Sequence, residues 1–137
     1  MIALDTNILI RVVTGDDPEQ LAVALEVMRS GDLWVCKTVL LETEWVLRYS
    51  YKLSCEAILE ALRRLLGFRS LQVEDRNAVL EALSLFEEGM DFADALHLAS
   101  GSRALSFATF DRTLATTAAK AQREGIPPVT LLSAADS

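Results

Sequence analysis

Residues 2–14 read IALDTNILIRVVT, and this stretch sets the pattern of the whole chain. The apolar run Ile2-Ala3-Leu4 predicts a buried strand, which meets an acid at Asp5 before a helical pattern begins over 7–14. The same alternation continues to the end of the chain. We predict further strands at 33–36, 71–73, 106–109 and 129–132, and further helices near 18–29, 38–51, 55–66, 76–88, 92–102 and 112–123. Strands separated by helices predict an α/β fold with a parallel sheet and helices on both faces.

Cap residues support these boundaries. The segment Asp17-Pro18-Glu19-Gln20 places an acid at an N-cap, a proline at the first helical position and a glutamine at the third. Ser54 and Asp75 are the predicted N-caps of the helices that follow them.

The size and composition indicate one domain covering residues 1–137. The chain is 51% hydrophobic and can bury a core without help from disulfides. No run approaches the roughly 18 apolar residues of a membrane span, and the first residues lack the basic region of a signal peptide. Cys36 and Cys55 form no CxxC pair. We therefore expect a reduced, cytoplasmic protein with no membrane partner.

The charge balance is acidic. Thirteen basic and 20 acidic residues give a net charge of −7, which argues against nucleic-acid binding because phosphate contacts need Lys and Arg. An RNA-binding role therefore requires a local basic rim. The candidates for it are Arg11, Lys37, Arg48, Lys52 and Arg112, of which Arg11 and Arg112 are the predicted RNA contacts.

Four acids stand where a parallel sheet places a site. Asp5 follows the first predicted strand and Asp111 follows the fourth. Asp94 lies in the first turn of the helix before that fourth strand, and Glu42 lies one turn into the helix after the second. Sites in such sheets lie beyond the carboxyl ends of the strands, so we expect the four to share one edge. Carboxylates crowded in this way resist ionisation.

Each acid also has a structural interpretation. Asp5 and Asp111 could cap helices, and Asp94 could form a capping pair with Asp91. Glu42 could be a surface acid. However, it shares a helix face with apolar residues that include Trp45, and a charge on an apolar stripe needs a partner or a metal.

Glu44 competes with Glu42 for a place in the site. It lies about 200° away round the same helix, beside Leu40, Leu41 and Leu47, so the two acids cannot point at one site. The pattern alone does not choose between them. His97, the single histidine, stands three residues after Asp94, and we expect it to be a structural, hydrogen-bonded residue.

Four segments resemble the motifs of the PIN-domain family in order and spacing along nearly the whole chain. They are Leu4-Asp5-Thr6-Asn7, Val39 to Arg48 with Glu42 as the acid, Asp91 to Ala99 with Asp94, and Ala108-Thr109-Phe110-Asp111. The compact length and the turn over 14–18 are similar to the VapC-type toxin branch. Some members carry a further acid after the fourth motif, where this chain has Arg112 and Thr113.

The resemblance implies a three-layer α/β/α sandwich with a central parallel sheet of about five strands. It also implies a metal-dependent endoribonuclease with Asp5, Glu42, Asp94 and Asp111 as its catalytic acids. Asp5, Asp94 and Asp111 would bind Mg²⁺ or Mn²⁺, which prefer carboxylate oxygens. Glu42 would orient or deprotonate the attacking water, or help to hold a second ion. The residues expected to orient these carboxylates are Thr6, Asn7 and Thr109.

The resemblance further implies several partners. The RNA substrate would be tRNA, rRNA or mRNA, cut in single strands or loops, and a toxin would have a cognate antitoxin. A homodimer is also implied, and the helix at 55–66 hints at one because it has more apolar residues than one face needs: Ile58, Leu59, Leu62, Leu65 and Leu66. The alternatives are a free-standing RNA-processing nuclease and a PIN module that binds without catalysis.

Two other classes fit the sequence poorly. An aspartate-nucleophile phosphatase needs a second Asp two residues after the first, where this chain has Asn7. A phosphoacceptor module needs an acidic pair at the first strand and a Lys near the last strands, but only Asp5 is present and no Lys follows Thr109 until Lys120.

Overall fold

A computed structural model describes residues 1–134 of the chain. Two compact units divide it at the start of the fifth helix: an N-terminal unit, Met1–Arg76, and a C-terminal unit, Asn77–Ser137. Each unit contains parallel strands joined by helices, as the alternating pattern predicts.

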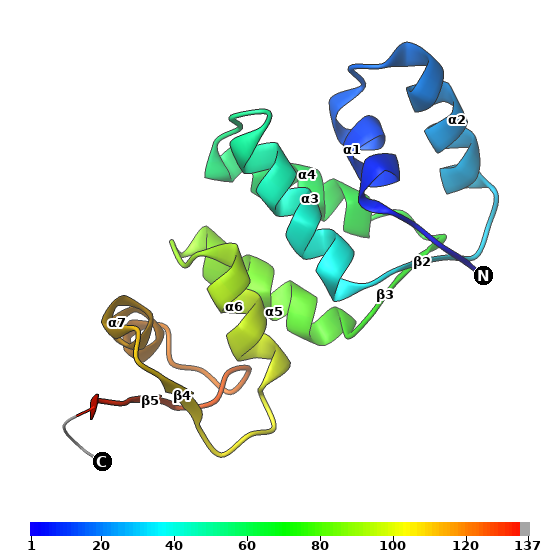
Figure 1. Cartoon of the computed structure of the whole chain (residues 1–137). Helices are drawn as coiled ribbons and strands as arrows, with labels where there is room; N and C mark the ends of the chain where they lie inside the picture. Colours follow the sequence, from blue (N-terminus) through cyan, green and yellow to red (C-terminus); the bar gives the residue numbers. More distant parts are fainter. Residues whose placement is uncertain (135–137) are drawn as a thin grey trace. The chain divides into compact units, whose positions relative to one another are not determined.

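The N-terminal unit holds a three-stranded parallel sheet in the order β1-β2-β3 (Figure 1). Ile2 lies opposite Leu33, and Leu33 lies opposite Leu71. Parallel neighbours need a crossover connection, and pairs of helices provide both. The elements in chain order are β1 (Ile2–Ala3), α1 (Thr6–Thr14), α2 (Pro18–Arg29), β2 (Leu33–Val35), α3 (Lys37–Tyr49), α4 (Cys55–Leu66) and β3 (Leu71–Val73).

The core of this unit lies between its sheet and its helices. Leu33 and Val35 of β2 are fully buried, as are Leu9 of α1 and Leu47 of α3. Four of the five apolar residues noted in α4 are also buried, and the fifth, Leu59, is half-buried. The apolar excess of α4 is therefore used in packing within the chain, and it does not provide the exposed face from which a dimer was inferred.

Two of the three predicted caps are confirmed. The side chain of Asp17 accepts a hydrogen bond from the Gln20 amide, and that of Ser54 accepts one from the amide of Ala57. The prediction for Asp75 is wrong. Its φ of 49° lies in the left-handed region instead of the extended region of an N-cap, and its carboxylate pairs with Lys37 at 3.1 Å.

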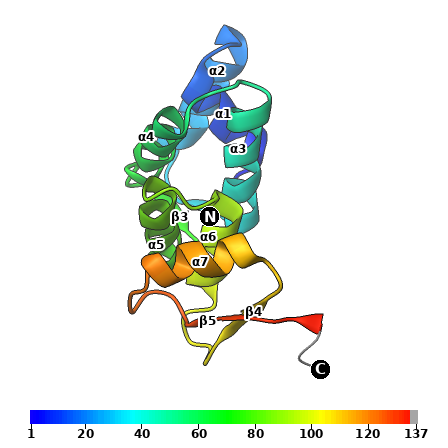
Figure 2. The same ribbon diagram turned by 90° about the vertical axis from the view of Figure 1, so that its left-hand side faces the viewer.

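The C-terminal unit contains a second parallel ladder, β4-β5, in which Phe107 lies opposite Val129 and α7 makes the crossover (Figure 2). Phe86 and Phe92 pack edge to face in its core, with ring centroids 5.6 Å apart. Its elements are α5 (Arg76–Glu87), α6 (Phe92–Ser100), β4 (Phe107–Thr109), α7 (Arg112–Lys120) and β5 (Val129–Leu131).

One arginine fastens the loop after α7 to α5. Arg123 donates to Glu81 at 3.2 Å and to Ser84 at 3.0 Å, and it also binds Glu88. Gly125 lies so close to this cluster that a Cβ there would meet the Glu81 carboxyl group at 2.5 Å. The absence of a side chain at residue 125 therefore allows the loop to approach α5.

The α/β prediction is confirmed. All five predicted strands and all seven predicted helices occur within residues 1–134, and every strand pair there is parallel. Their ends differ from the prediction by a few residues, and the strands form one three-stranded and one two-stranded ladder. The expectation that the first strand is buried is wrong, because both residues of β1 are exposed and only Leu4, which follows them, is buried. In this described part of the chain, no helix has the length and apolar character needed to cross a membrane.

Candidate active site

Asp5 and Glu42 are connected through one threonine of the N-terminal unit. Asp5 stands at the N-cap position of α1 in an extended conformation, and its Oδ1 accepts a hydrogen bond from the Thr6 amide at 2.8 Å. The Thr6 side chain is buried, and its hydroxyl donates to Oε1 of Glu42. Each carboxylate keeps a second oxygen outside these bonds. Thr6 therefore contacts both acids, and its role of orienting them for catalysis stays a prediction.

The bond at Asp5 is not the usual helix cap. A capping side chain accepts from the second or third helical amide, whereas Asp5 accepts from the first, that of Thr6. Asn7 is exposed, and its side chain makes no hydrogen bond within residues 1–134. Asn7 is therefore not positioned by the chain in the way that Thr6 is.

The structure separates Glu42 from Glu44. Glu44 is 1% exposed, and its Oε2 lies 2.9 Å from Nε of Arg48 in an ion pair one helical turn away. Glu42 is exposed and bonded by Thr6. The buried Glu44 is thus engaged in a pair within its own helix, while Glu42 remains accessible beside Asp5.

The expectation that Glu42 lies on a buried apolar stripe is wrong. Its face of α3 is the solvent face, where Trp45 and Tyr49 are 53% and 50% exposed with ring centroids 5.1 Å apart. The opposite face, with Leu40 and Leu47, packs against α1 and α4. Both faces of α3 carry apolar residues, so periodicity could not show which one is buried.

The C-terminal unit holds Asp94 and Asp111 at two helix starts. Asp111 caps α7 by accepting from the Leu114 amide at 3.0 Å, and its own amide donates to Oγ1 of Thr109. Asp94 lies in the first turn of α6, and its amide donates to the carboxylate of the N-cap residue Asp91. The capping interpretation is therefore correct for Asp111. It leaves that carboxylate a second oxygen, so capping and metal ligation are compatible.

Electrostatic repulsion acts on Asp94. Partial burial raises the pKa of its carboxyl group, and the negative charges of Asp91 and Asp111 raise that pKa further, while His97 opposes the shift. Asp94 and Asp111 are thus close enough to interact. His97 itself is exposed and its ring makes no hydrogen bond within residues 1–134, so the expectation of a structural histidine is wrong.

These acids suit a hard divalent cation by donor type and by charge. Carboxylate oxygens are the ligands that Mg²⁺ and Mn²⁺ prefer, and a cation would relieve the repulsion that raises the pKa of Asp94. Within residues 1–134, however, no three His, Cys, Asp or Glu side chains are grouped so that they could hold a metal ion. The structure presents the candidates as two pairs: Asp5 with Glu42, and Asp94 with Asp111.

The expected basic rim is largely engaged elsewhere. Lys52 and Arg112 are exposed and make no ion pair in the described part of the chain. The other three candidates bind acids of the chain: Arg11 binds Asp16 at 3.1 Å, Lys37 binds Asp75 at 3.1 Å and Arg48 binds Glu44 at 2.9 Å.

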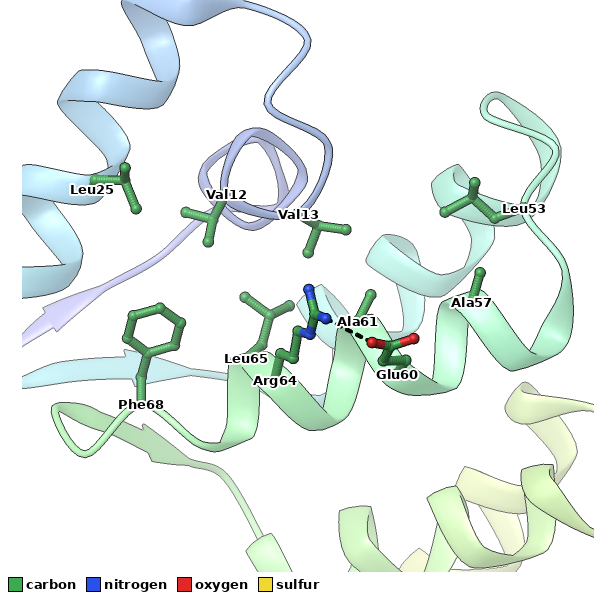
Figure 3. A pocket seen from close by; sticks show the side chains of 10 residues that line it. All are labelled: Val12, Val13, Leu25, Leu53, Ala57, Glu60, Ala61, Arg64, Leu65 and Phe68. Atoms are coloured by element: carbon green, nitrogen blue, oxygen red, sulfur yellow. Dashed lines mark hydrogen bonds and ion pairs between the residues drawn. The ribbon is translucent and has the colours of Figure 1, made fainter.

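Two pockets open on the N-terminal unit, and they differ in the polar groups that they offer. One, of about 520 Å³, is mostly apolar, and its charged residues Glu60 and Arg64 bind each other at 2.7 Å (Figure 3). The other, of about 530 Å³, lies between α1 and α2. We call it the α1–α2 pocket, and its lining residues are Asn7, Ile8, Arg11, Glu19, Gln20, Val23 and Ala24.

Two polar residues that α2 contributes to this pocket, Glu19 and Gln20, were not predicted as site residues. The sequence pattern indicated only that they begin a helix. A partial signal existed, because Asn7 and Arg11 stand four residues apart and share one face of α1.

Comparison with known proteins identifies the family. The sequence matches the PIN domain family over residues 2–130, and the chain therefore belongs to that family. PIN domains are generally nucleases that act on RNA and usually use Mg²⁺ or Mn²⁺. No curated protein matches the chain.

Proposed function

We propose that residues 1–137 form a single PIN domain that is a Mg²⁺- or Mn²⁺-dependent endoribonuclease, acting in the cytoplasm as a VapC-type toxin. One observation carries the nuclease proposal. All four motif acids are present, and they interact in pairs, Asp5 with Glu42 through Thr6 and Asp94 with Asp111 through charge.

In this proposal the cation is held by Asp5, Asp94 and Asp111, and Glu42 accepts a proton from the attacking water. A bound divalent ion supplies charge neutralisation at the phosphoryl oxygens and favours ionisation of water. Glu42 has one oxygen engaged by Thr6, and its other oxygen takes a proton from the attacking water. The water oxygen bonds to phosphorus, the bond from phosphorus to the 3′ oxygen breaks, and that oxygen takes a proton from solvent, which leaves 5′-phosphate and 3′-hydroxyl ends.

The test is cleavage of a mixed tRNA and rRNA pool by the purified protein with Mg²⁺, with Mn²⁺ and with EDTA. We expect metal-dependent cutting, and we expect Asp94→Asn to reduce it at least about 100-fold. Asp91→Asn is the matched control, because it removes a neighbouring charge while asparagine still serves as an N-cap. Equal activity in the wild type and Asp94→Asn, or no cutting by protein shown free of any partner, would overturn the proposal.

The toxin role needs a separate test. A toxin should stop growth when expressed alone, and co-expression of a small protein encoded beside it should restore growth. The acidic charge of −7 favours a basic antitoxin segment, with an arginine reaching the carboxylates. Metal-dependent cleavage without growth arrest would instead indicate a free-standing RNA-processing nuclease.

A PIN module that binds without catalysis is the second candidate. The family match is compatible with it, because that match shows the PIN family and tests no activity of this chain. Isothermal titration with Mn²⁺ separates the two candidates, because only the nuclease requires a cation that Asp94→Asn would fail to bind. The proposed homodimer rests on the family resemblance alone, and light scattering of the purified protein tests it.

A further inference from the structure

We propose that the α1–α2 pocket binds one unpaired base of the RNA and prefers guanine. The inference rests on the proposed function, because it assigns part of the substrate of the same nuclease. The volume of the α1–α2 pocket, about 530 Å³, lies within the range of about 300–1,000 Å³ typical of small-ligand sites.

The position of the pocket connects it to the candidate catalytic acids. The helix that begins at Asp5 also carries Asn7, Ile8 and Arg11, which line the pocket. Asn7 follows Asp5 by two residues, about 3 Å along the helix axis, and Arg11 lies one turn further. A base held in the pocket would therefore belong to a nucleotide close to the phosphate at Asp5.

Arg11 lines the pocket and keeps unused hydrogen-bond donors. Its Nε donates to Oε1 of Gln20 at 2.6 Å, and its Nη1 donates to Asp16 at 3.1 Å and to the Tyr51 hydroxyl at 3.2 Å. These bonds leave the two N–H groups of Nη2 unused. Because arginine only donates, it fixes the oxygen of Gln20 toward itself, and the amide NH₂ of Gln20 is left as a further donor.

Acceptors lie beside these donors. Glu19 and Asn7 both line the pocket and are exposed. The Glu19 carboxylate and the Asn7 amide make no hydrogen bond within residues 1–134. A carboxylate can only accept, so it favours a base that carries adjacent N–H donors. Guanine combines two such donors, N1–H and the N2 amino group, with the acceptors O6 and N7 that arginine binds.

The pocket also has an apolar wall for the face of a base. Ala24 is buried and Ile8 is half-buried, while Val23 is 59% exposed although it is apolar. A planar base placed against Val23 would remove that surface from water, which is favourable in proportion to the apolar area covered.

The charge balance favours recognition of a base over recognition of phosphate here. Arg11 is already paired with Asp16, and Glu19 would repel a phosphate group. Hydrogen bonds to a base do not require net positive charge, so they suit a chain with a net charge of −7. The pocket of Figure 3 lacks this capacity, because its Glu60 and Arg64 bind each other.

The first experiment measures binding without cleavage. The full chain, labelled with ¹⁵N and free of metal, is titrated with GMP, AMP, CMP and UMP. We expect amide shifts concentrated at Asn7, Gln20 and Val23, with GMP binding at least about tenfold more tightly than the other three. Shifts elsewhere, or equal binding of all four nucleotides, would overturn the proposal.

Variants connect the preference to the pocket. Glu19→Gln should remove the tenfold preference for GMP, because a side-chain amide, unlike a carboxylate, does not require two donors from the base. Gln20→Ala should weaken GMP binding. It should keep the N-cap of α2, because Asp17 accepts from the backbone amide of residue 20. Glu26→Gln is the matched control, an exposed acid of the same helix outside the pocket. If Glu19→Gln kept the full preference, the assignment would be wrong.

The cut sites distinguish failure of this inference from failure of the nuclease. Metal-dependent cleavage with no base preference near the cut, together with no amide shifts on addition of GMP, would overturn the base-binding proposal and support the nuclease. GMP binding at the pocket without cleavage under any metal condition would support the base-binding site and overturn the nuclease.

Discussion

The two acid pairs are held in different ways. In the N-terminal unit, Thr6 donates to Asp5 through its amide and to Glu42 through its buried hydroxyl. In the C-terminal unit, burial and neighbouring negative charge raise the pKa of Asp94. The chain thus supplies hydrogen-bond donors to both acids of the first pair, whereas at Asp94 the repulsion from Asp91 and Asp111 is opposed only by His97. We infer that Glu42 contributes little to holding a cation, whereas Asp94 and Asp111 carry much of the demand for one.

The largest expected effect concerns metal binding. Mn²⁺ at about 100 times its Kd should stabilise the wild type by about 2.7 kcal/mol, a rise in Tm of about 10 °C. Asp111→Asn should remove most of that rise while asparagine keeps the helix cap, and Glu42→Gln should retain most of it. Thermal unfolding with and without Mn²⁺ measures both. An equal loss in the two variants would contradict the division of roles.

The next effect concerns positioning. Thr6→Val removes the hydroxyl that orients Glu42 and keeps the shape of the side chain, so kcat should fall about 10–100-fold while the Mn²⁺ affinity changes little. Thr43→Val is the control, because Thr43 is equally buried but bonds only the Val39 carbonyl of its own helix. If both variants lost activity equally, general destabilisation would explain the loss and Thr6 would have no positioning role.

A smaller effect concerns stability without metal. The folded state raises the pKa of Asp94 above its ordinary value of 3.8, so the ionised carboxylate opposes folding at neutral pH. Asp94→Asn should therefore stabilise the metal-free protein at pH 7, within the range of about 0–1 kcal/mol found for solvent-screened charges. The gain should shrink as the pH falls through the raised pKa toward 3.8. Urea unfolding across this pH range tests it, and a gain that grows on acidification would contradict it.

The smallest effect concerns Asp16, whose carboxylate accepts hydrogen bonds within the N-terminal unit. Hydrogen bonds from Tyr51 and Thr14 lower the pKa of Asp16. Tyr51→Phe should raise that pKa toward its ordinary value, and the resulting loss of stability should be present at neutral pH and disappear as the pH falls through the pKa of Asp16. An NMR titration of the Asp16 carboxyl group checks the direction, and an unchanged pKa would show that Tyr51 does not stabilise this charge.

Local patterns accounted for most of the fold. Apolar periodicity and the Asp17 and Ser54 caps predicted the helices and strands, because backbone hydrogen bonding within an element depends on residues a few positions apart. Asp75 was an exception, since its contact with Lys37 comes from a residue 38 positions away.

The sequence by itself therefore determined the order of the elements, the family and the positions of the four motif acids along the chain. Only the tertiary structure decided how those acids are held. It buried Glu44, placed the hydroxyl of Thr6 on Glu42, 36 residues away, and turned the face with Trp45 toward solvent. The physical reason is that such choices depend on which helix faces are buried, and burial follows from the packing of segments that are distant in the chain.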